Sequence, residues 1–428
     1  MKCVVMNTEF VENESAKWHS LAFLCGIFFV YTVDRALLGL LAIPIQNETG
    51  VSDLQFGILN SVVFWTYALA VPFAGLVGDR YDKRMVICMA VLTWSAMTIL
   101  AGFAHGFWSL LALVSVAITL PQTFYGPSAN ALVAKEHVGT RAVALSIHQA
   151  AYYVGWFASG GVAAAALSVF GSWRGAYVSF GIFGLAIGLA FLLLTRKRTG
   201  DGSGEMARKP AAASGIARSF RAFFCCPSAL LAASGYVAMV FSAFGYTAWG
   251  PKFVAVKFGV SPAVAGTGVM FWHFAVAFAS ILVAGTVADR FVRRWPRFRL
   301  VLQVSALVAA TPVLAVFGMA SALPAVWAAA AVYGFLRGTF ESCQYASLFD
   351  VITPECRAGA VGFLNVFAGL VGSLAPILIG WLSERFGVRG MEVGFAALGG
   401  SLATAALLML VSLLFTFNRD RIKEVLHD

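Results

Sequence analysis

Long runs of apolar residues, each able to cross a lipid bilayer as a helix, follow one another through the 428-residue chain. Hydrophobic residues make up 60% of the sequence and charged residues 12%, whereas soluble domains average about 45–50% and about 25%. A water-soluble fold is therefore excluded, and the sequence predicts an all-α membrane protein with twelve transmembrane helices. The expected spans are 18–46, 54–78, 85–104, 107–133, 142–168, 173–195, 228–252, 262–288, 299–320, 323–350, 358–383 and 391–417.

Basic residues are distributed unevenly around these spans. If the N-terminus lies inside and twelve helices alternate, 23 of the 30 Lys and Arg residues fall in inner segments or at the inner ends of spans, and five in outer segments or at the outer ends of spans. The other two, Arg35 and Arg337, lie deep within helices. Inner loops of membrane proteins carry an excess of Lys and Arg. Both termini are therefore predicted to be cytoplasmic, in a bacterial inner membrane or a plasma membrane. Membrane orientation accounts for the net charge of +10, and no nucleic-acid partner is expected.

A long polar stretch divides the chain. Residues 196–227 are rich in Gly, Ser, Lys and Arg, a composition typical of a flexible linker. They separate a predicted N-terminal six-helix half, 1–195, from a C-terminal half, 228–428. The end of the linker places Arg218 and Arg221 among phenylalanines, which fits either an amphipathic helix lying on anionic lipid or an ordinary basic flank.

The two halves repeat short motifs at equivalent places. GLVGDRYDKR follows the second span and GTVADRFVRR the eighth, with five identical residues at a constant offset. Arg-Ala precedes the fifth and eleventh spans, and Phe-Gly follows both. Repeated six-helix halves are typical of secondary transporters. The repeated loop residues are Gly75, Asp79, Arg80 and Arg84 in the first copy and Gly285, Asp289, Arg290 and Arg294 in the second.

The loop G-x-x-x-D-R-x-x-K-R resembles the signature loop of the major facilitator superfamily. YTVDR in the first span, followed by GILNSVVFWTYALAVPFAGLVGDR, resembles two of its subgroups, the anion:cation symporters and the Spinster-like transporters. The resemblance implies a monomeric transporter that works by alternating access, with the repeated loop residues gating its cytoplasmic side. Gly75 is expected to permit close helix approach, and Asp79 to face a helix N-terminus of the other half. A solvated basic loop that only sets topology is the alternative.

Two pairs of charged residues lie inside predicted spans. Asp34 and Arg35 are adjacent near the middle of the first span, where a charge costs about 2.5–3.5 kcal/mol or more. They are expected to face a wet pathway, a counter-charge, or both. Arg337 and Glu341 in the tenth span are four residues apart, which puts them on one helix face within ion-pairing reach. A purely structural role is the alternative for each pair.

Uncharged polar residues accompany these charges. Aligning the halves through Arg141 and Arg357 pairs the fourth span with the tenth, and Pro121 and Pro127 predict a bend in the fourth. The accompanying side chains are Gln122 and Tyr125 in the fourth span, His148 and Tyr152 in the fifth, Tyr246 in the seventh, His273 in the eighth, and Gln344 and Tyr345 in the tenth.

These residues predict a carrier for a small organic anion, such as a sugar acid or another carboxylate. Arg35 and Arg337, from opposite halves, would bind a carboxylate. Asp34 and Glu341 would exchange protons and couple transport to the proton gradient. Hydrogen bonds to the substrate are expected from Gln122, Tyr125, Tyr152 and Gln344, and His148 is a further candidate proton carrier.

Gln122 departs from the pattern of both resembled subgroups, which carry a glutamate on the fourth helix. A glutamine cannot carry a proton, so coupling would pass to Asp34 or Glu341, or the mechanism would be exchange or uniport. Export of an amphipathic compound, a lysolipid or a drug, and a non-transporting sensor on the same fold stay open. The sequence holds no nucleotide-binding loop, metal-ligand cluster or catalytic arrangement, so neither a cofactor, a metal nor enzymatic activity is expected.

Overall fold

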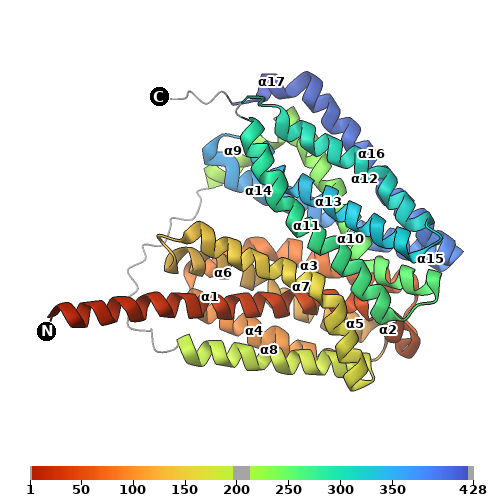
Figure 1. Ribbon diagram of the computed structural model, residues 1–428, viewed down its shortest axis with the longest axis horizontal. Helices are drawn as coiled ribbons and strands as arrows, with labels where there is room; N and C mark the ends of the chain where they lie inside the picture. The colour runs from red at the N-terminus through yellow and green to blue at the C-terminus, as the bar shows by residue number, and fades with distance from the viewer. Residues whose placement is uncertain (1, 196–212, 293, 423–428) are drawn as a thin grey trace. The chain divides into compact units, whose positions relative to one another are not determined.

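Helices account for nearly all of the residues that the computed structural model describes, which are 2–195, 213–292 and 294–422 (Figure 1). These residues contain no β-strand. An α-helix satisfies its backbone hydrogen bonds within its own segment, as the interior of a bilayer demands. The secondary structure therefore suits the apolar composition.

The first part of the chain forms helices close to the predicted spans. Span 18–46 is divided at Leu41, which lies between the end of α1 at Leu40 and the beginning of the short helix α2 at Ala42. In span 107–133 a π-helical segment, Leu111–Ile118, comes shortly before Pro121 and makes this helix irregular. The helices are α1 (Lys2–Leu40), α2 (Ala42–Thr49), α3 (Asp53–Arg80), α4 (Lys83–Ala101), α5 (Gly106–Leu110), α6 (Thr119–Glu136), α7 (Arg141–Phe170) and α8 (Trp173–Thr195).

The second part of the chain follows its predicted spans equally closely. Span 358–383 is interrupted at Ser373, and span 391–417 ends in a π-helical segment, Ser412–Thr416. The helices are α9 (Ala213–Phe224), α10 (Pro227–Phe258), α11 (Pro262–Val292), α12 (Phe298–Met319), α13 (Leu323–Phe349), α14 (Arg357–Gly372), α15 (Leu374–Phe386), α16 (Val388–Val411) and α17 (Phe417–Asp420).

Eleven helical segments of the described chain are long and apolar enough to cross a membrane. The segment of α13 is not among them, although its 27 residues exceed the roughly 20 that a span needs. This helix carries both Arg337 and Glu341, which lower its hydropathy. Of the twelve predicted spans, the one absent from these eleven segments is therefore the one that contains the predicted ion pair.

The repeated Phe-Gly and Arg-Ala motifs have the same structural role in both halves. Gly171 and Gly387 each follow the end of a helix with positive φ, 67° and 58°, a conformation that glycine adopts without steric cost. Arg141 Nε and Arg357 Nε each donate to a backbone carbonyl near the end of the preceding helix, at 3.1 and 3.3 Å. The sequence repeat is thus accompanied by a repeat of local structure.

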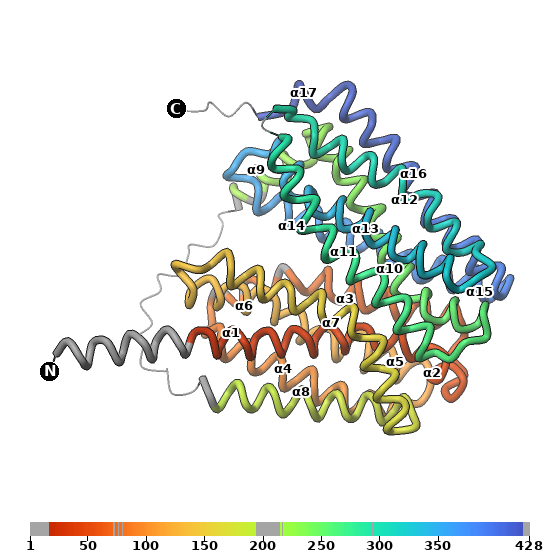
Figure 2. Tube along the Cα trace, viewed as in Figure 1, coloured from red at the N-terminus to blue at the C-terminus, as the bar shows by residue number. Residues whose placement is uncertain are grey.

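Contacts divide the chain into two compact units whose boundaries fall inside α1 and α3. The first comprises Met1–Leu38 with Ala70–Arg208, and the second Gly39–Leu69 with Lys209–Asp428. In the first unit α4 packs against both α6 and α8, and in the second α11 packs on α13 and α12 on α16 (Figure 2). The end of α1, all of α2 and the beginning of α3 therefore pack with the C-terminal helices.

The helix α9 forms at the end of the predicted linker and is amphipathic. The rings of Phe220 and Phe223 lie 5.6 and 6.5 Å from that of Phe363 on α14, whereas Arg218 and Arg221 are exposed. Of the two expectations for this segment, the amphipathic helix is the one found. Contact of its basic face with lipid stays a prediction.

Candidate functional site

Asp34 and Arg35 are neighbours on α1 but have different surroundings. Successive residues of an α-helix point about 100° apart. Arg35 Nη1 donates to the Tyr31 hydroxyl at 2.9 Å, and its guanidinium lies 5.6 Å from the centre of the Tyr31 ring. Asp34 is buried, and neither of its carboxyl oxygens has a hydrogen-bond partner among the described residues. Adjacency in the chain therefore does not by itself place the two side chains in one environment, and their facing one wet pathway stays a prediction.

The carboxyl of Asp34 faces side chains of α4 and α8. Polar groups beside this carboxyl include the Trp94 indole, the Thr98 hydroxyl and the Tyr177 hydroxyl. Trp94 and Tyr177 are buried, and their polar atoms also find no hydrogen-bond partner in the described chain. Buried polar atoms are nearly always paired, with protein or with water. The surroundings of the Asp34 carboxyl, inside the first unit, are therefore polar, and they contain several buried polar atoms with no hydrogen-bond partner among the described residues.

Tyr125 and His148 form a buried hydrogen-bonded pair between α6 and α7. The Tyr125 hydroxyl donates to the Leu24 carbonyl at 2.6 Å, so it accepts from His148 Nε2 at 2.9 Å. This fixes the proton of the neutral imidazole on Nε2 and leaves Nδ1 with a lone pair. No described residue donates to that nitrogen. The Phe28 ring stacks on the imidazole at 4.6 Å.

Aromatic rings surround this pair on the α1 side. Phe28 lies 5.5 Å from Tyr125 and 5.2 Å from Tyr152, and Tyr31 lies 6.0 Å from Tyr125. Gln122 is 1% exposed, and its amide nitrogen finds no acceptor within the described part of the chain. The predicted residues Tyr125, His148 and Tyr152 are thus brought together around Phe28.

In the second unit, Arg337 and Glu341 form the predicted ion pair along α13. Arg337 Nε lies 2.7 Å from Glu341 Oε1. Arg337 Nη1 donates to His273 Nε2 at 3.1 Å, and because arginine can only donate, this histidine nitrogen carries no proton. The rings of Tyr246 and Tyr333 lie 4.7 and 4.9 Å from the imidazole. The guanidinium is therefore held by one carboxylate and one neutral acceptor.

A polar cluster beside this ion pair was not predicted from the sequence. Asn365 Oδ1 on α14 accepts from the Tyr236 hydroxyl at 3.0 Å and from the Tyr345 hydroxyl at 3.2 Å. Gln344, one of the predicted residues, faces Tyr236. The signal that could have revealed the cluster is the lone amide in the apolar stretch GFLNVFAGL, because a polar residue within a span is expensive.

The first copy of the repeated loop forms an ion pair within the first unit. Arg84 Nη2 lies 2.5 Å from Glu136 Oε1 at the end of α6. Arg80 is exposed, and the side chain of Asp79 lies outside the described residues. The expectation of close packing at Gly75 is wrong: a Cβ there would meet no described atom within 4 Å. The close approach is instead at Gly78, where a Cβ would lie 3.1 Å from Ser128 Oγ.

The second copy of the loop forms a three-membered charge cluster. Arg299 Nη2 on α12 lies 3.1 Å from Asp289 Oδ1, and its Nη1 lies 3.0 Å from Asp350 Oδ1 after α13. Arg290 and Arg294 are exposed. Arg299 and Asp350 were missed because they lie outside the repeated motif. The gating role of both loops stays a prediction.

Comparison with known proteins gives consistent results. The family model described as "Major Facilitator Superfamily" matches residues 23–376. An "MFS-type efflux pump" of Mycolicibacterium smegmatis is 26% identical over 406 residues, covering 92% of this chain and 89% of that protein. "Protein spinster homolog 1" of Homo sapiens is 25% identical and covers 85% and 72%, and the "Hexuronate transporter" of Bacillus subtilis is 22% identical and covers 91% and 92%.

Solved structures share the fold. The crystal structure of a bacterial homolog to the human lysosomal transporter Spinster, inward-facing and unoccupied, aligns with a TM-score of 0.83 and 22% identity over 96% of this chain and 99% of that one. A nucleoside transporter aligns with a TM-score of 0.72 and 14% identity over 93% and 100%. The predicted fold class, an all-α membrane protein of twelve spans, is confirmed.

Proposed function

Because the chain belongs to the major facilitator superfamily, we propose that it moves a small organic anion, a sugar acid or another carboxylate, across the membrane by alternating access and in company with protons. The chain is a multi-pass membrane transporter related to carriers, not to enzymes. We further propose that it works as a monomer in a bacterial inner membrane or plasma membrane, with both termini cytoplasmic.

The observation that carries the proposal is the setting of Arg337. A guanidinium stays charged at any working pH and can bind a carboxylate through two parallel hydrogen bonds. Here it lies in a membrane protein, bonded to the Glu341 carboxylate at 2.7 Å and to a neutral histidine nitrogen at 3.1 Å. Glu341 thus occupies the place that a substrate carboxylate would take.

Proton coupling follows from this competition. While Glu341 is ionised, it holds Arg337 and disfavours a second carboxylate. When Glu341 gains a proton, its charge is lost and Arg337 can bind the substrate anion. Proton and anion then bind together and leave together, which is the linkage that a symporter needs. Arg35, on α1 of the first unit, is proposed as a second binding group for the anion.

Other groups have supporting roles in the proposal. The hydroxyls of Tyr236 and Tyr345 and the amide of Asn365 suit the hydroxyl groups of a sugar acid, as do Gln122, Tyr125, Tyr152 and Gln344. Since Gln122 cannot carry a proton, Asp34 and His148 remain proposed secondary proton sites. A carboxyl without an ion-pair partner can gain and lose a proton without breaking a salt bridge.

The relatives support two substrate classes. The hexuronate transporter is named for a sugar acid and favours an organic anion. The efflux pump and the spinster homolog favour the second candidate, export of an amphipathic compound such as a lysolipid or a drug. The aromatic side chains around Phe28 would suit such a compound, whereas the Arg337 ion pair suits the anion.

Reconstituted protein can separate the two. Proteoliposomes would be given radiolabelled glucuronate with an inward proton gradient, without one, and with a protonophore. We expect uptake that the gradient stimulates several-fold and the protonophore abolishes. A parallel set would receive a labelled lysophospholipid. Transport of the lysophospholipid without transport of any of a panel of carboxylates would contradict the anion proposal.

A further inference from the structure

The amphipathic helix α9 lies against the beginning of α14, in the same compact unit (Figure 1). The Phe223 ring is 2% exposed and lies 6.5 Å from the Phe363 ring of α14. Ser219, one turn before Phe223, is also buried, and a Cβ at Gly359 of α14 would lie 2.4 Å from the Ser219 Cβ. One face of α9 is therefore fixed to the protein.

Next to this fixed face, α9 carries two exposed aromatic rings. Phe220 is 51% exposed and Phe224 is 36% exposed, and the two rings lie 4.4 Å apart. Successive residues of an α-helix are about 100° apart, so these rings lie about 60° and about 100° around the helix from Phe223. Rings that the protein leaves uncovered in this way gain by leaving water for the acyl region of a bilayer.

Arg218 and Arg221 come next around the helix. Arg221 lies about 60° beyond Phe224, and Arg218 lies about 60° beyond Arg221. Both arginines are exposed, and neither makes a hydrogen bond or an ion pair with a described residue. Glu355, in the single turn Pro354–Cys356 that packs against α9, is exposed and pairs with neither of them. The basic face of α9 is therefore available to a partner.

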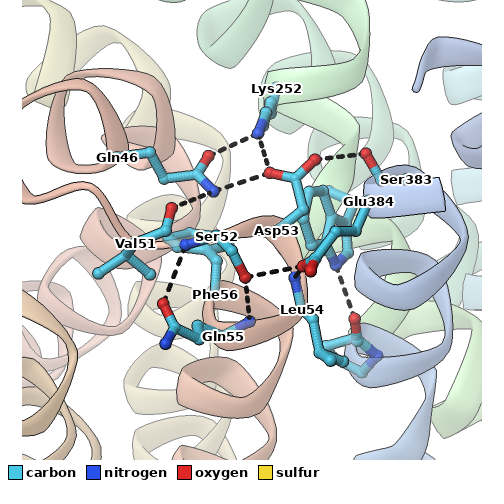
Figure 3. A network of polar contacts seen from close by, with 12 residues as sticks. Gln46, Val51, Ser52, Asp53, Leu54, Gln55, Phe56, Lys252, Ser383 and Glu384 are labelled. Atoms are coloured by element: carbon cyan, nitrogen blue, oxygen red, sulfur yellow. Dashed lines mark hydrogen bonds and ion pairs between the residues drawn. The ribbon is translucent and has the colours of Figure 1, made fainter. Parts of the chain in front are cut away.

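A basic residue towards the opposite end of α10 has a different setting. Lys252 forms an ion pair with Asp53 and donates to Gln46 Oε1 at 2.5 Å (Figure 3). Its charge is thus neutralised within the protein. The helix α9 precedes the other end of α10, which the distribution of basic residues predicts to be cytoplasmic. The two α9 arginines differ from Lys252 in having no such partner among the described residues.

We propose that α9 binds anionic phospholipid of the cytoplasmic leaflet. Arg218 and Arg221 bind the phosphate groups of the lipid. The rings of Phe220 and Phe224 enter the acyl region beside them. These four residues are called the α9 lipid face. The lipid is a bound partner here and not a transported compound, so the proposal does not depend on the identity of the substrate.

The order of the three sectors around α9 supports a lipid surface over a dissolved anion. Fixed residues, exposed rings and arginines follow one another, as expected for a helix with protein on one side, hydrocarbon on the next and headgroups on the third. A phosphate ion in water would use the arginines alone and leave the rings unexplained. A guanidinium binds a phosphate through two parallel hydrogen bonds, and anionic lipid of the cytoplasmic leaflet attracts basic segments that flank a span.

The first test measures lipid binding to the full chain in detergent by native mass spectrometry. The protein would be titrated with dioleoyl phosphatidylglycerol or with dioleoyl phosphatidylcholine, which has the same acyl chains and no net charge. We expect tighter binding of phosphatidylglycerol. The double variant Arg218→Gln/Arg221→Gln should lower that affinity by about tenfold or more, as expected from losing hydrogen bonds to a charged group, and should leave phosphatidylcholine binding unchanged.

A matched control lies at the opposite end of the same unit. Arg385 and Arg389 are exposed at the predicted outer side, and Arg385→Gln/Arg389→Gln removes the same charge. This variant should keep the parent affinity for phosphatidylglycerol. An equal loss in both double variants would refute the α9 lipid face. Displacement of phosphatidylglycerol by millimolar inorganic phosphate would also refute it, because the arginines would then bind a dissolved anion.

The depth of α9 gives a second readout that keeps both lipid-facing arginines in one of its variants. Spin labels would be placed on a cysteine-free background at Phe224→Cys and, separately, at Arg218→Cys, in nanodiscs containing phosphatidylglycerol. Oxygen concentrates in the acyl region and a nickel complex in water. We expect the ratio of oxygen to nickel accessibility to be several-fold higher at position 224 than at 218. Equal ratios would place both faces in water and overturn the proposal. Neither test uses a transported substrate, so failure of the anion proposal would leave both results unchanged.

Discussion

The Arg337 guanidinium and the Glu341 carboxylate lie 2.7 Å apart, one turn from each other on α13. The same guanidinium donates to His273 of α11 at 3.1 Å. The Arg337 guanidinium is therefore shared between the Glu341 carboxylate, which can lose its charge by gaining a proton, and a neutral nitrogen of His273. Both the binding and the coupling predictions follow from this arrangement.

Arg337→Ala should abolish binding of the anion while the protein stays folded. Removal of the guanidinium leaves Glu341 as an uncompensated negative charge, which repels a carboxylate. Arg337→Lys is the matched control, since it keeps the charge and loses the bidentate geometry, and it should bind weakly. Arg35→Ala should also abolish binding. Isothermal titration calorimetry with a panel of carboxylates measures this, and wild-type affinity in either alanine variant would refute the assignment.

Glu341→Gln should uncouple transport from protons. A glutamine cannot ionise, so Arg337 is free of its competitor at every pH. We expect anion exchange between the two sides of a proteoliposome to continue, while uptake no longer responds to an imposed proton gradient. Asp34→Asn tests whether the second carboxyl shares this function. If Glu341→Gln keeps full stimulation by the gradient, the coupling proton lies elsewhere.

Asn365→Ala should weaken the binding of hydroxylated anions selectively. The substitution removes an amide and leaves the Tyr236 and Tyr345 hydroxyls without their common acceptor. A lost neutral hydrogen bond costs about 0.5–1.5 kcal/mol, so the apparent affinity for a sugar acid should fall by about two- to twelvefold. A simple monocarboxylate without hydroxyl groups serves as the control ligand, and an equal loss for both would show that Asn365 has no part in selecting hydroxyls.

Gly334→Ala should destabilise the protein and disturb the ion pair. A Cβ at Gly334 of α13 would lie 2.1 Å from the His273 carbonyl oxygen of α11, so the helices must move apart. Overpacking of this kind costs about 1–3 kcal/mol. Gly362→Ala on α14 is the matched control, because a Cβ there would meet no described atom within 4 Å. Thermal unfolding in detergent should separate the two variants, and similar midpoints would contradict the packing.

The sequence by itself determined where the chain crosses the membrane. A membrane helix makes its backbone hydrogen bonds within its own segment, and its apolar composition can be recognised in the sequence. The bounds of α7 and α8 therefore agree with the predicted spans within two residues. The Arg337–Glu341 pair was predictable for the same reason, since residues four apart on a helix always share a face. The correspondence between Arg141 and Arg357 was likewise predictable from the sequence, because each precedes an equivalent span of its half.

Only the tertiary structure decided which polar groups meet. Asn365 contacts a tyrosine 129 residues away, Arg299 joins two aspartates on separate elements, and Lys252 meets Asp53 across 199 positions. Such contacts depend on how each helix is rotated and where it crosses its neighbours, and local sequence encodes neither. The same rotation turns Asp34 towards α4 and α8 and away from the Arg35–Tyr31 contact, although the two charges are adjacent in the chain.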